Sequence, residues 1–252
     1  EKGFRADRFA THPGQLKGNN DILCLTRPDI VTSLHEQYFA AGADISETNT
    51  FSGTTIAQDD YHLDARDVRD INSEGARLGR ESADRWTAKE PHKPRFVAGS
   101  IGPLNKMLSM SSDVNDPGAR SVTFEQVYEA YRQQVAALYE GGVDMFLIET
   151  ITDTLNCKAA IKAILADLKR PHPEIAKSLE RIEIWRWGHA MPQPSPGFLT
   201  APARAALAGL QGSLLFAHSD LSAYSVFEEA FTHGVCAARQ VLAASAVPLR
   251  TA

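Results

Sequence analysis

Residues 41–51, AGADISETNTF, decide how the fold of this chain is interpreted. Gly42 allows a tight turn after a helix, since a residue without Cβ adopts positive φ at low cost. Ile45 lies in a short strand that we expect to be buried. Four hydrogen-bonding side chains follow it in a row: Glu47, Thr48, Asn49 and Thr50. Because ligands of α/β proteins bind at the carboxyl ends of strands, this row predicts either a pocket floor or a polar turn that leaves the sheet.

Helices and strands alternate along the chain around this stretch. The expected elements are a helix over 28–41, a strand at Ile45, a helix over 65–86, a strand over 96–98, a helix over 123–141, a strand over 143–150 and a helix over 153–168. Thr123 and Gln126 form a capping box at one helix start. The run VDMFLIET, residues 143–150, predicts a strand covered on both faces that ends in Glu149. The alternation predicts an α/β fold with β/α units around a parallel sheet.

The composition excludes several classes of function. The chain has 252 residues, is 43% hydrophobic and carries a formal net charge of −5, which gives no reason to expect nucleic acid or an anionic membrane as partner. No apolar run approaches about 18 residues, so no membrane span is predicted. The first residues contain no apolar signal region, and the three separated cysteines are typical of reduced thiols. We therefore expect a soluble cytoplasmic protein without a cysteine metal site.

Five segments in this order carry a family resemblance: KGNNDIL, AGADISETNTFSGTTIAQDDY, VAGSIGPLNK, SSDVNDPGARSVTF and YEGGVDMFLIETITDTLNCKAA. Together they resemble the homocysteine-binding methyltransferase domain of cobalamin-dependent methionine synthase, from residue 4 to about 167. The resemblance implies a (β/α)8 TIM barrel and methyl transfer to homocysteine in methionine biosynthesis. In that family zinc stabilises the homocysteine thiolate, which attacks the methyl group of methylcobalamin. Cobalamin- and folate-binding domains are the partners that the family implies.

The resemblance also marks six candidate substrate-binding residues: Glu47, Thr48, Asn49, Thr50, Asn105 and Glu149. Glu149 of LIET matches the acidic residue that pairs with the substrate ammonium; the alternative is a helix cap or a structural ion pair with an arginine. For the row after Ile45 the alternative is a set of hydrogen bonds that fix the loop. Asn105 matches a loop position near the site. No catalytic residue is assigned.

Three motifs of the family are absent from this chain: Asp-Gly-x-x-Gly-Thr, Gly-x-Asn-Cys and Gly-Gly-Cys-Cys, of which the last two hold its zinc ligands. Cys157 matches a small helix residue and is expected to be a buried or half-buried thiol. Three strands occupy about 170 of the 252 residues, which leaves too few for five further units of about 30 residues. We therefore predict about half a barrel, inactive alone, whose unpaired sheet edges favour self-association.

The sequence changes character near residue 169, which predicts a partial barrel over 1–168 and an unrelated α+β tail over 169–252. The tail is predicted to hold strands over 181–187 and 210–220 and a helix over 222–242. It resembles the C-terminal end of flavin-dependent amine oxidases, which implies Asp220 and Ser222 as FAD-binding residues. The glycine-rich dinucleotide motif is absent. The alternative functions are therefore a fragment of such an oxidase or a non-catalytic chain that folds only with a partner.

Overall fold

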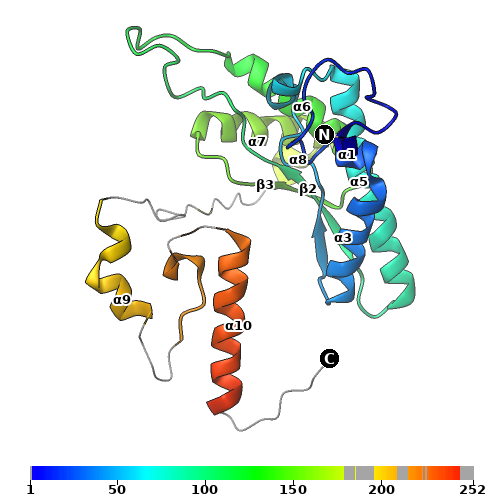
Figure 1. Cartoon of the computed structure of the whole chain (residues 1–252). Helices are drawn as coiled ribbons and strands as arrows, with labels where there is room; N and C mark the ends of the chain where they lie inside the picture. The colour runs from blue at the N-terminus through cyan, green and yellow to red at the C-terminus, as the bar shows by residue number, and fades with distance from the viewer. Residues whose placement is uncertain are drawn as a thin grey trace. The chain divides into compact units, whose positions relative to one another are not determined.

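The computed structural model describes residues 2–178, 185, 196–208, 215–222, 224 and 226–244 (Figure 1). The chain divides into two compact units, Glu1–Glu180 and Arg181–Ala252. The domain junction expected at residue 168 stays a prediction. Among the helices of the described ranges, none has the length and apolar character that a membrane crossing requires.

The first unit is built on a parallel sheet of three strands. They are β1 (Ile45–Glu47), β2 (Phe96–Ile101) and β3 (Met145–Ile148), in the order β1-β2-β3. The longer helices are α3 (Pro28–Ala40), α5 (Ala65–Lys89), α6 (Phe124–Glu140) and α7 (Thr154–Leu168). Short helices are α1 (Lys2–Arg5), α2 (Leu23–Thr26), α4 (Thr55–Gln58), the 3-10 helix η1 (Asp59–Tyr61) and α8 (Ile175–Ser178). The predicted α/β class with parallel β/α units is therefore confirmed for these residues.

Local sequence signals explain where these helices begin. Pro28 stands in the first turn of α3, where its missing N–H costs nothing. Thr123 and Gln126 form the expected capping box at the start of α6. The carboxylate of Asp153 accepts hydrogen bonds from two backbone N–H groups at the start of α7. Gly42 has a φ of 102° in the turn after α3, as the opening stretch predicts.

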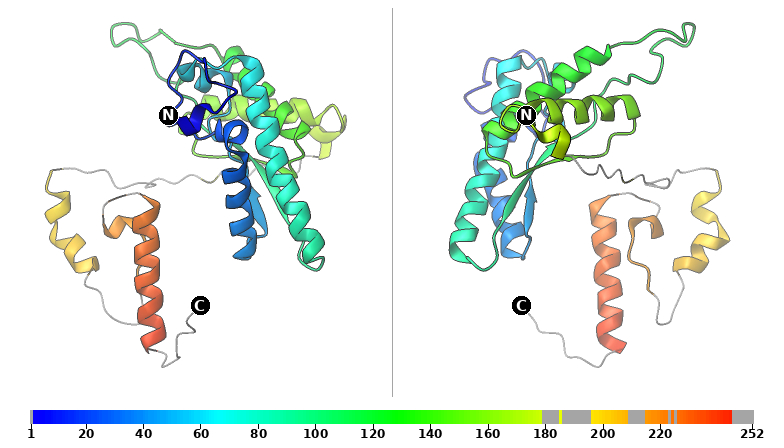
Figure 2. Two further views of the ribbon diagram at one scale, coloured as in Figure 1. Left: turned by 45° about the vertical axis from the view of Figure 1, so that its right-hand side comes forward. Right: turned by 180° about the vertical axis from the view of Figure 1, so that it is seen from behind.

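One face of the sheet is covered by helices. The helices α3, α5, α6 and α7 pack against their neighbours in chain order and against the strands (Figures 1 and 2). The core between helices and sheet includes Ile101 of β2, Val135 and Leu138 of α6, and Ala160 of α7, all fully buried. Tyr131 is buried in the same cluster and donates a hydrogen bond from its hydroxyl to the Gly102 carbonyl, 3.0 Å away. This packing fixes the end of β2.

The opposite face of the sheet carries exposed apolar side chains. Ile45 is 49% exposed, Phe96 and Met145 are each 39% exposed, and Leu147 is 41% exposed. The expectation that β3 is covered on both faces is therefore wrong, as is the expected burial of Ile45. The reason is that the helices of the first unit lie on one side of its sheet, so these residues on the other side remain accessible, although Ala98 and Ser100 of β2 are buried. The (β/α)8 barrel and the self-association of its edges stay proposals.

The second unit contains α9 (Pro202–Ala208), α10 (Phe227–Ala244) and the 3-10 helices η2 (Phe198–Thr200) and η3 (Ser219–Leu221). The predicted strand over 181–187 lies outside the described residues apart from Trp185. The predicted strand over 210–220 is wrong where it is described, because 215–218 are irregular and η3 follows. The side chain of His218 accepts a hydrogen bond from the Asp220 N–H, a local bond that favours a turn.

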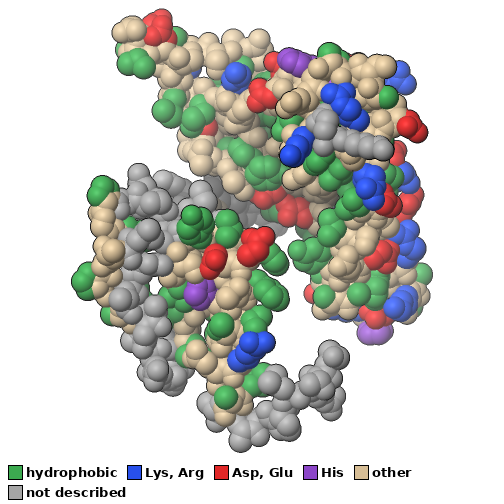
Figure 3. All heavy atoms as spheres, viewed as in Figure 1, with side chains coloured by type: hydrophobic (Ala, Val, Ile, Leu, Met, Phe, Trp, Pro, Cys, Tyr) green, Lys and Arg blue, Asp and Glu red, His purple; other side chains and the backbone are tan. Residues whose placement is uncertain are grey.

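The helix expected over 222–242 begins only at Phe227, so Ser222 does not stand at its start. Figure 3 shows hydrophobic side chains along α10. Among them, Phe227 and Phe231 are 71% and 61% exposed, and their rings stack with centroids 5.9 Å apart. This helix is therefore amphipathic, with an apolar face that the described residues leave open.

Candidate functional site

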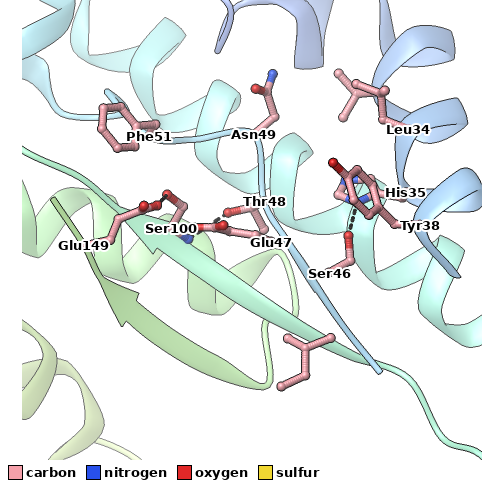
Figure 4. A pocket seen from close by; sticks show the side chains of 12 residues that line it. Leu34, His35, Tyr38, Ser46, Glu47, Thr48, Asn49, Phe51, Ser100 and Glu149 are labelled. Atoms are coloured by element: carbon pink, nitrogen blue, oxygen red, sulfur yellow. Dashed lines mark hydrogen bonds between the residues drawn. The ribbon is translucent and has the colours of Figure 1, made fainter. Parts of the chain in front are cut away.

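A groove of about 510 Å³ lies between α3 and the carboxyl ends of the strands. Figure 4 shows the side chains that line it. Its polar lining consists of His35, Ser46, Glu47, Thr48, Asn49, Ser100 and Glu149. Leu34 and Tyr38 of α3 form part of its apolar lining. An apolar wall with a few convergent polar groups at strand ends is the arrangement expected of a small-molecule site.

Two carboxyl groups meet in this groove beside Ser100. The Ser100 hydroxyl donates a hydrogen bond of 2.6 Å to Oε1 of Glu149, and the Glu47 carboxyl lies close enough to that of Glu149 to interact with it. Partial burial, and then the interaction with the Glu149 carboxyl and its negative charge, raise the pKa of Glu47 to about 7, while the nearby Ser100 hydroxyl acts against this. Two carboxyl groups can share a hydrogen bond only when one is protonated. The Glu47 carboxyl therefore holds its proton up to near neutral pH.

No cation of the protein balances this pair within the described lining of the groove, which contains neither lysine nor arginine. The structure also tests the two alternative roles of Glu149, a helix cap and an ion pair with an arginine. The helix that follows is capped by Asp153, not by Glu149. Within the described residues no ion pair with an arginine is found for Glu149 either. Glu149 is thus a half-buried carboxylate that can accept hydrogen bonds from a cationic ligand.

The two threonines of the predicted row join β1 to β2. Thr48 is 4% exposed and Thr50 is fully buried. The Thr48 hydroxyl accepts a hydrogen bond from the Ser100 N–H at 2.9 Å, and the Thr50 hydroxyl donates to the Ser100 carbonyl at 3.0 Å. Their hydroxyl oxygens lie 2.7 Å apart. These contacts are those of the loop-fixing alternative, although Thr48 also lines the groove.

The two asparagines have different surroundings. Asn49 lines the groove, and its side-chain amide donates to the Asn20 carbonyl at 2.8 Å. Asn105 is exposed, donates to Asp60 at 2.8 Å, and is not part of the groove lining. The structure thus brings together Glu47, Thr48, Asn49 and Glu149 of the six candidates, and leaves out Thr50 and Asn105. Whether any of them binds substrate stays a prediction.

Sequence reasoning missed Ser100 and His35. Ser100 lies four positions after the partly exposed Phe96 in β2, so period-two alternation would have placed it on the same face as Phe96, beside the strand ends. His35 is 4% exposed, and its Nδ1 lies 2.5 Å from the Ser46 hydroxyl. Burial lowers the pKa of His35, so its ring is neutral at physiological pH. It joins α3 to β1 at the side of the groove.

The described residues do not fit a zinc ion. No group of three or more His, Cys, Asp or Glu side chains placed to hold a metal is found among them. Cys24 is buried and donates its thiol to the Asn49 carbonyl at 3.3 Å, and burial raises its pKa to about 12. A thiol with such a pKa stays protonated and is a poor ligand. Cys157 is half-buried, which confirms the expectation of a buried or half-buried thiol at this position.

The two candidate flavin-binding residues belong to the second unit. The carboxylate of Asp220 lies 3.1 Å from Nδ1 of His218. The Ser222 hydroxyl lies 2.6 Å from Nε2 of His233 on α10. The second of these contacts joins the residue after η3 to α10. The resemblance of this tail to amine oxidases stays a prediction.

Comparison with known proteins decides the family. The model of the family described as homocysteine S-methyltransferase matches residues 4–185, which is more than half of the chain. The chain belongs to the homocysteine S-methyltransferase family. Residues 186–252 lie outside this match.

Solved structures of a homocysteine methyltransferase are also similar to this member of the family. The metallated form of the Escherichia coli homocysteine methyltransferase MmuM is 24% identical with a TM-score of 0.47, and the alignment covers 60% of this chain and 50% of that one. The oxidized form is 23% identical with a TM-score of 0.47 and the same coverage. The apo form is 22% identical with a TM-score of 0.44, covering 62% and 49%. The chain therefore spans about half the length of these enzymes.

Proposed function

We propose that the groove binds the amino-acid part of homocysteine, with Glu149 accepting hydrogen bonds from the substrate ammonium. One observation supports this most directly: the Glu149 carboxylate, bonded to Ser100, stands at the end of β3 in a groove whose described lining offers no lysine or arginine. An ammonium group supplies the missing positive charge and three N–H donors. Asn49 and Thr48 belong to the same lining, and we infer that they contact the rest of the amino acid.

The finer features of the reaction are also proposals. The methionine synthase-like segments favour methylcobalamin as methyl donor, held on a separate cobalamin-binding domain, with a folate-binding domain as a further partner. They also favour a cytoplasmic protein whose three strands are part of a (β/α)8 barrel. Because the described residues offer no zinc site, nothing in them activates the substrate thiol. We propose that residues 1–252 alone bind homocysteine without transferring a methyl group to it.

The test measures binding and turnover on one sample of the whole chain. Calorimetry with homocysteine is expected to show binding, and incubation with homocysteine, methylcobalamin and added zinc is expected to yield no methionine above a protein-free control. Absence of homocysteine binding would contradict the proposed groove. Methionine formation that depends on the chain would contradict the proposed inactivity.

The pair of carboxyl groups predicts a pH dependence of this binding. The raised pKa of Glu47 means that the pair carries a proton below about pH 7, and the ammonium competes with that proton. Affinity for homocysteine is therefore expected to rise about fivefold to tenfold between pH 6 and 7.5, where the substrate thiol stays protonated. In Glu47→Gln this change should fall below about twofold.

Calorimetry in buffers of different ionisation enthalpy measures both the affinity and the protons released. Glu140→Gln is the matched control, because Glu140 is exposed and pairs with Arg69 away from the groove. If the affinity of the unmodified chain for homocysteine does not change across this pH range, the proposed competition between the ammonium group and a proton on Glu47 is wrong.

A further inference from the structure

One buried amide joins the ends of two strands from the helix side of the sheet. Gln134 of α6 is 1% exposed. Its Nε2 donates to the Thr50 carbonyl at 2.9 Å and lies 3.4 Å from the Ser100 carbonyl. Both neighbours are carbonyl oxygens, which only accept hydrogen bonds, so the NH2 group of the amide must face them and not its oxygen. A single side chain thus bonds the polar row after β1 and the residue of β2 that faces the groove.

Ser100 connects this amide to the groove. Its carbonyl is held by Gln134 and Thr50, and its N–H by Thr48. Its hydroxyl, on the other face of the sheet, donates to Glu149 at 2.6 Å. A displacement of the Ser100 backbone therefore moves the donor that orients the Glu149 carboxylate.

Packing alone does not account for an amide at position 134. Its Oε1 has no hydrogen-bond partner among the described atoms, and an unpartnered buried acceptor carries a desolvation cost that an apolar side chain of similar size lacks. The two N–H donors are what distinguish glutamine from leucine or methionine at this position. The contribution of Gln134 to the site therefore lies in the hydrogen bonds that it donates to the Thr50 and Ser100 carbonyl groups.

We propose that Gln134 is a positioning residue that, through the Thr50 and Ser100 carbonyls, orients the Glu149 carboxylate in the groove. The expected effect of Gln134 on homocysteine binding rests on the proposed function. Its effect on the orientation of Glu149 does not, because that orientation exists in the ligand-free chain. Without the amide, the strand ends shift and the Ser100 hydroxyl no longer meets Glu149 at the same distance. The carboxyl pair then titrates differently, and the ammonium site is distorted.

The experiment uses the full chain with Gln134→Leu and Gln134→Met. Gln133→Leu is the matched control, because Gln133 is the exposed neighbour on α6 and, among the residues that the structure describes, its side chain bonds only to Glu129. Carbon-13 NMR of glutamate carboxyl groups, with signals assigned through Glu47→Gln and Glu149→Gln, follows the titration of the pair in the free chain. Calorimetry measures homocysteine affinity, and circular dichroism measures folding.

We expect both Gln134 variants to move the titration midpoint of the pair by about half a pH unit or more and to weaken homocysteine binding about tenfold, with Gln133→Leu unchanged. An unchanged titration in folded Gln134 variants would overturn the inference. Loss of folding in both variants would overturn it too, since the amide would then be a requirement of the core. If the unmodified chain does not bind homocysteine, the proposed function fails, and the titration alone still decides the role of Gln134.

Discussion

Replacing Glu149 with glutamine is expected to weaken homocysteine binding by about 100-fold, which corresponds to about 2.7 kcal/mol. Glutamine keeps the shape of the side chain and an oxygen that can accept the Ser100 hydroxyl bond. It removes the negative charge, and loss of one partner from a half-buried charged pair costs about 2–5 kcal/mol. The effect should therefore fall on the ammonium contact and leave the fold intact.

Calorimetry at pH 7.5 measures this change, where the unmodified pair has largely lost its proton. Glu125→Gln serves as control, because the side chain of Glu125 is 75% exposed and lies near Lys162 on the helix side. Thermal unfolding of both variants shows whether the fold is kept. A folded Glu149→Gln chain that binds homocysteine within about threefold of the unmodified chain would remove Glu149 from the ammonium site.

Local signals predicted most of the first unit. The capping box of Thr123 and Gln126 depends on residues three positions apart, so the sequence contains all of it. The coverage of β3 depends on elements far away in sequence, and there the prediction failed. An apolar run indicates that a strand can be buried, but Met145 and Leu147 remain exposed because the helices of the first unit occupy one face of its sheet.

The polar row after β1 was predicted as a unit, yet it divides by alternation. Thr48 and Thr50 are buried and bond to Ser100, whereas Glu47 is exposed on the opposite face. A period-two interpretation of the row would have separated the carboxylate from the two threonines. The opening stretch therefore supports both interpretations, since Glu47 lines the groove, Thr50 fixes the loop, and Thr48 does both.

The meeting of Glu47 with Glu149 could not be predicted from the sequence. It follows from the strand order, in which Glu47 of β1 pairs with Ala98 of β2, and Ala98 pairs with Met145 of β3. This register brings the ends of β1 and β3 to either side of Ser100. Glu47 and Glu149, about 100 positions apart, then interact, and the sequence around either residue alone gives no sign of this contact.

A second large effect is expected from Asp21→Asn, on stability. Asp21 is 5% exposed, and its carboxylate accepts hydrogen bonds from the Ser52 N–H at 2.7 Å and the Gln58 amide at 3.5 Å. Burial raises its pKa to about 7, although the bond from Ser52 acts in the opposite direction. No ion pair compensates its charge within the residues that the structure describes. The folded chain therefore favours the protonated acid.

The sign of the pH dependence follows from this raised pKa. The unfolded carboxyl group has a pKa of about 3.9, so between about pH 4 and 7 the folded state binds more protons than the unfolded state. The stabilising contribution of the neutral acid is complete below about pH 4 and is lost as the pH rises through about 7, by up to about 4 kcal/mol. Asparagine keeps an acceptor for the Ser52 N–H and carries no charge, so this loss should disappear.

Urea unfolding at pH 5 and pH 8 measures the difference between the two chains. At pH 8 Asp21→Asn is expected to exceed the unmodified chain in free energy of unfolding by several kcal/mol, and at pH 5 the gap should shrink to about 1 kcal/mol. Asp59→Asn is the control, because Asp59 is exposed and should leave the pH dependence unchanged. Equal pH dependences for Asp21→Asn and the unmodified chain would show that the Asp21 carboxyl group ionises in the folded state without cost.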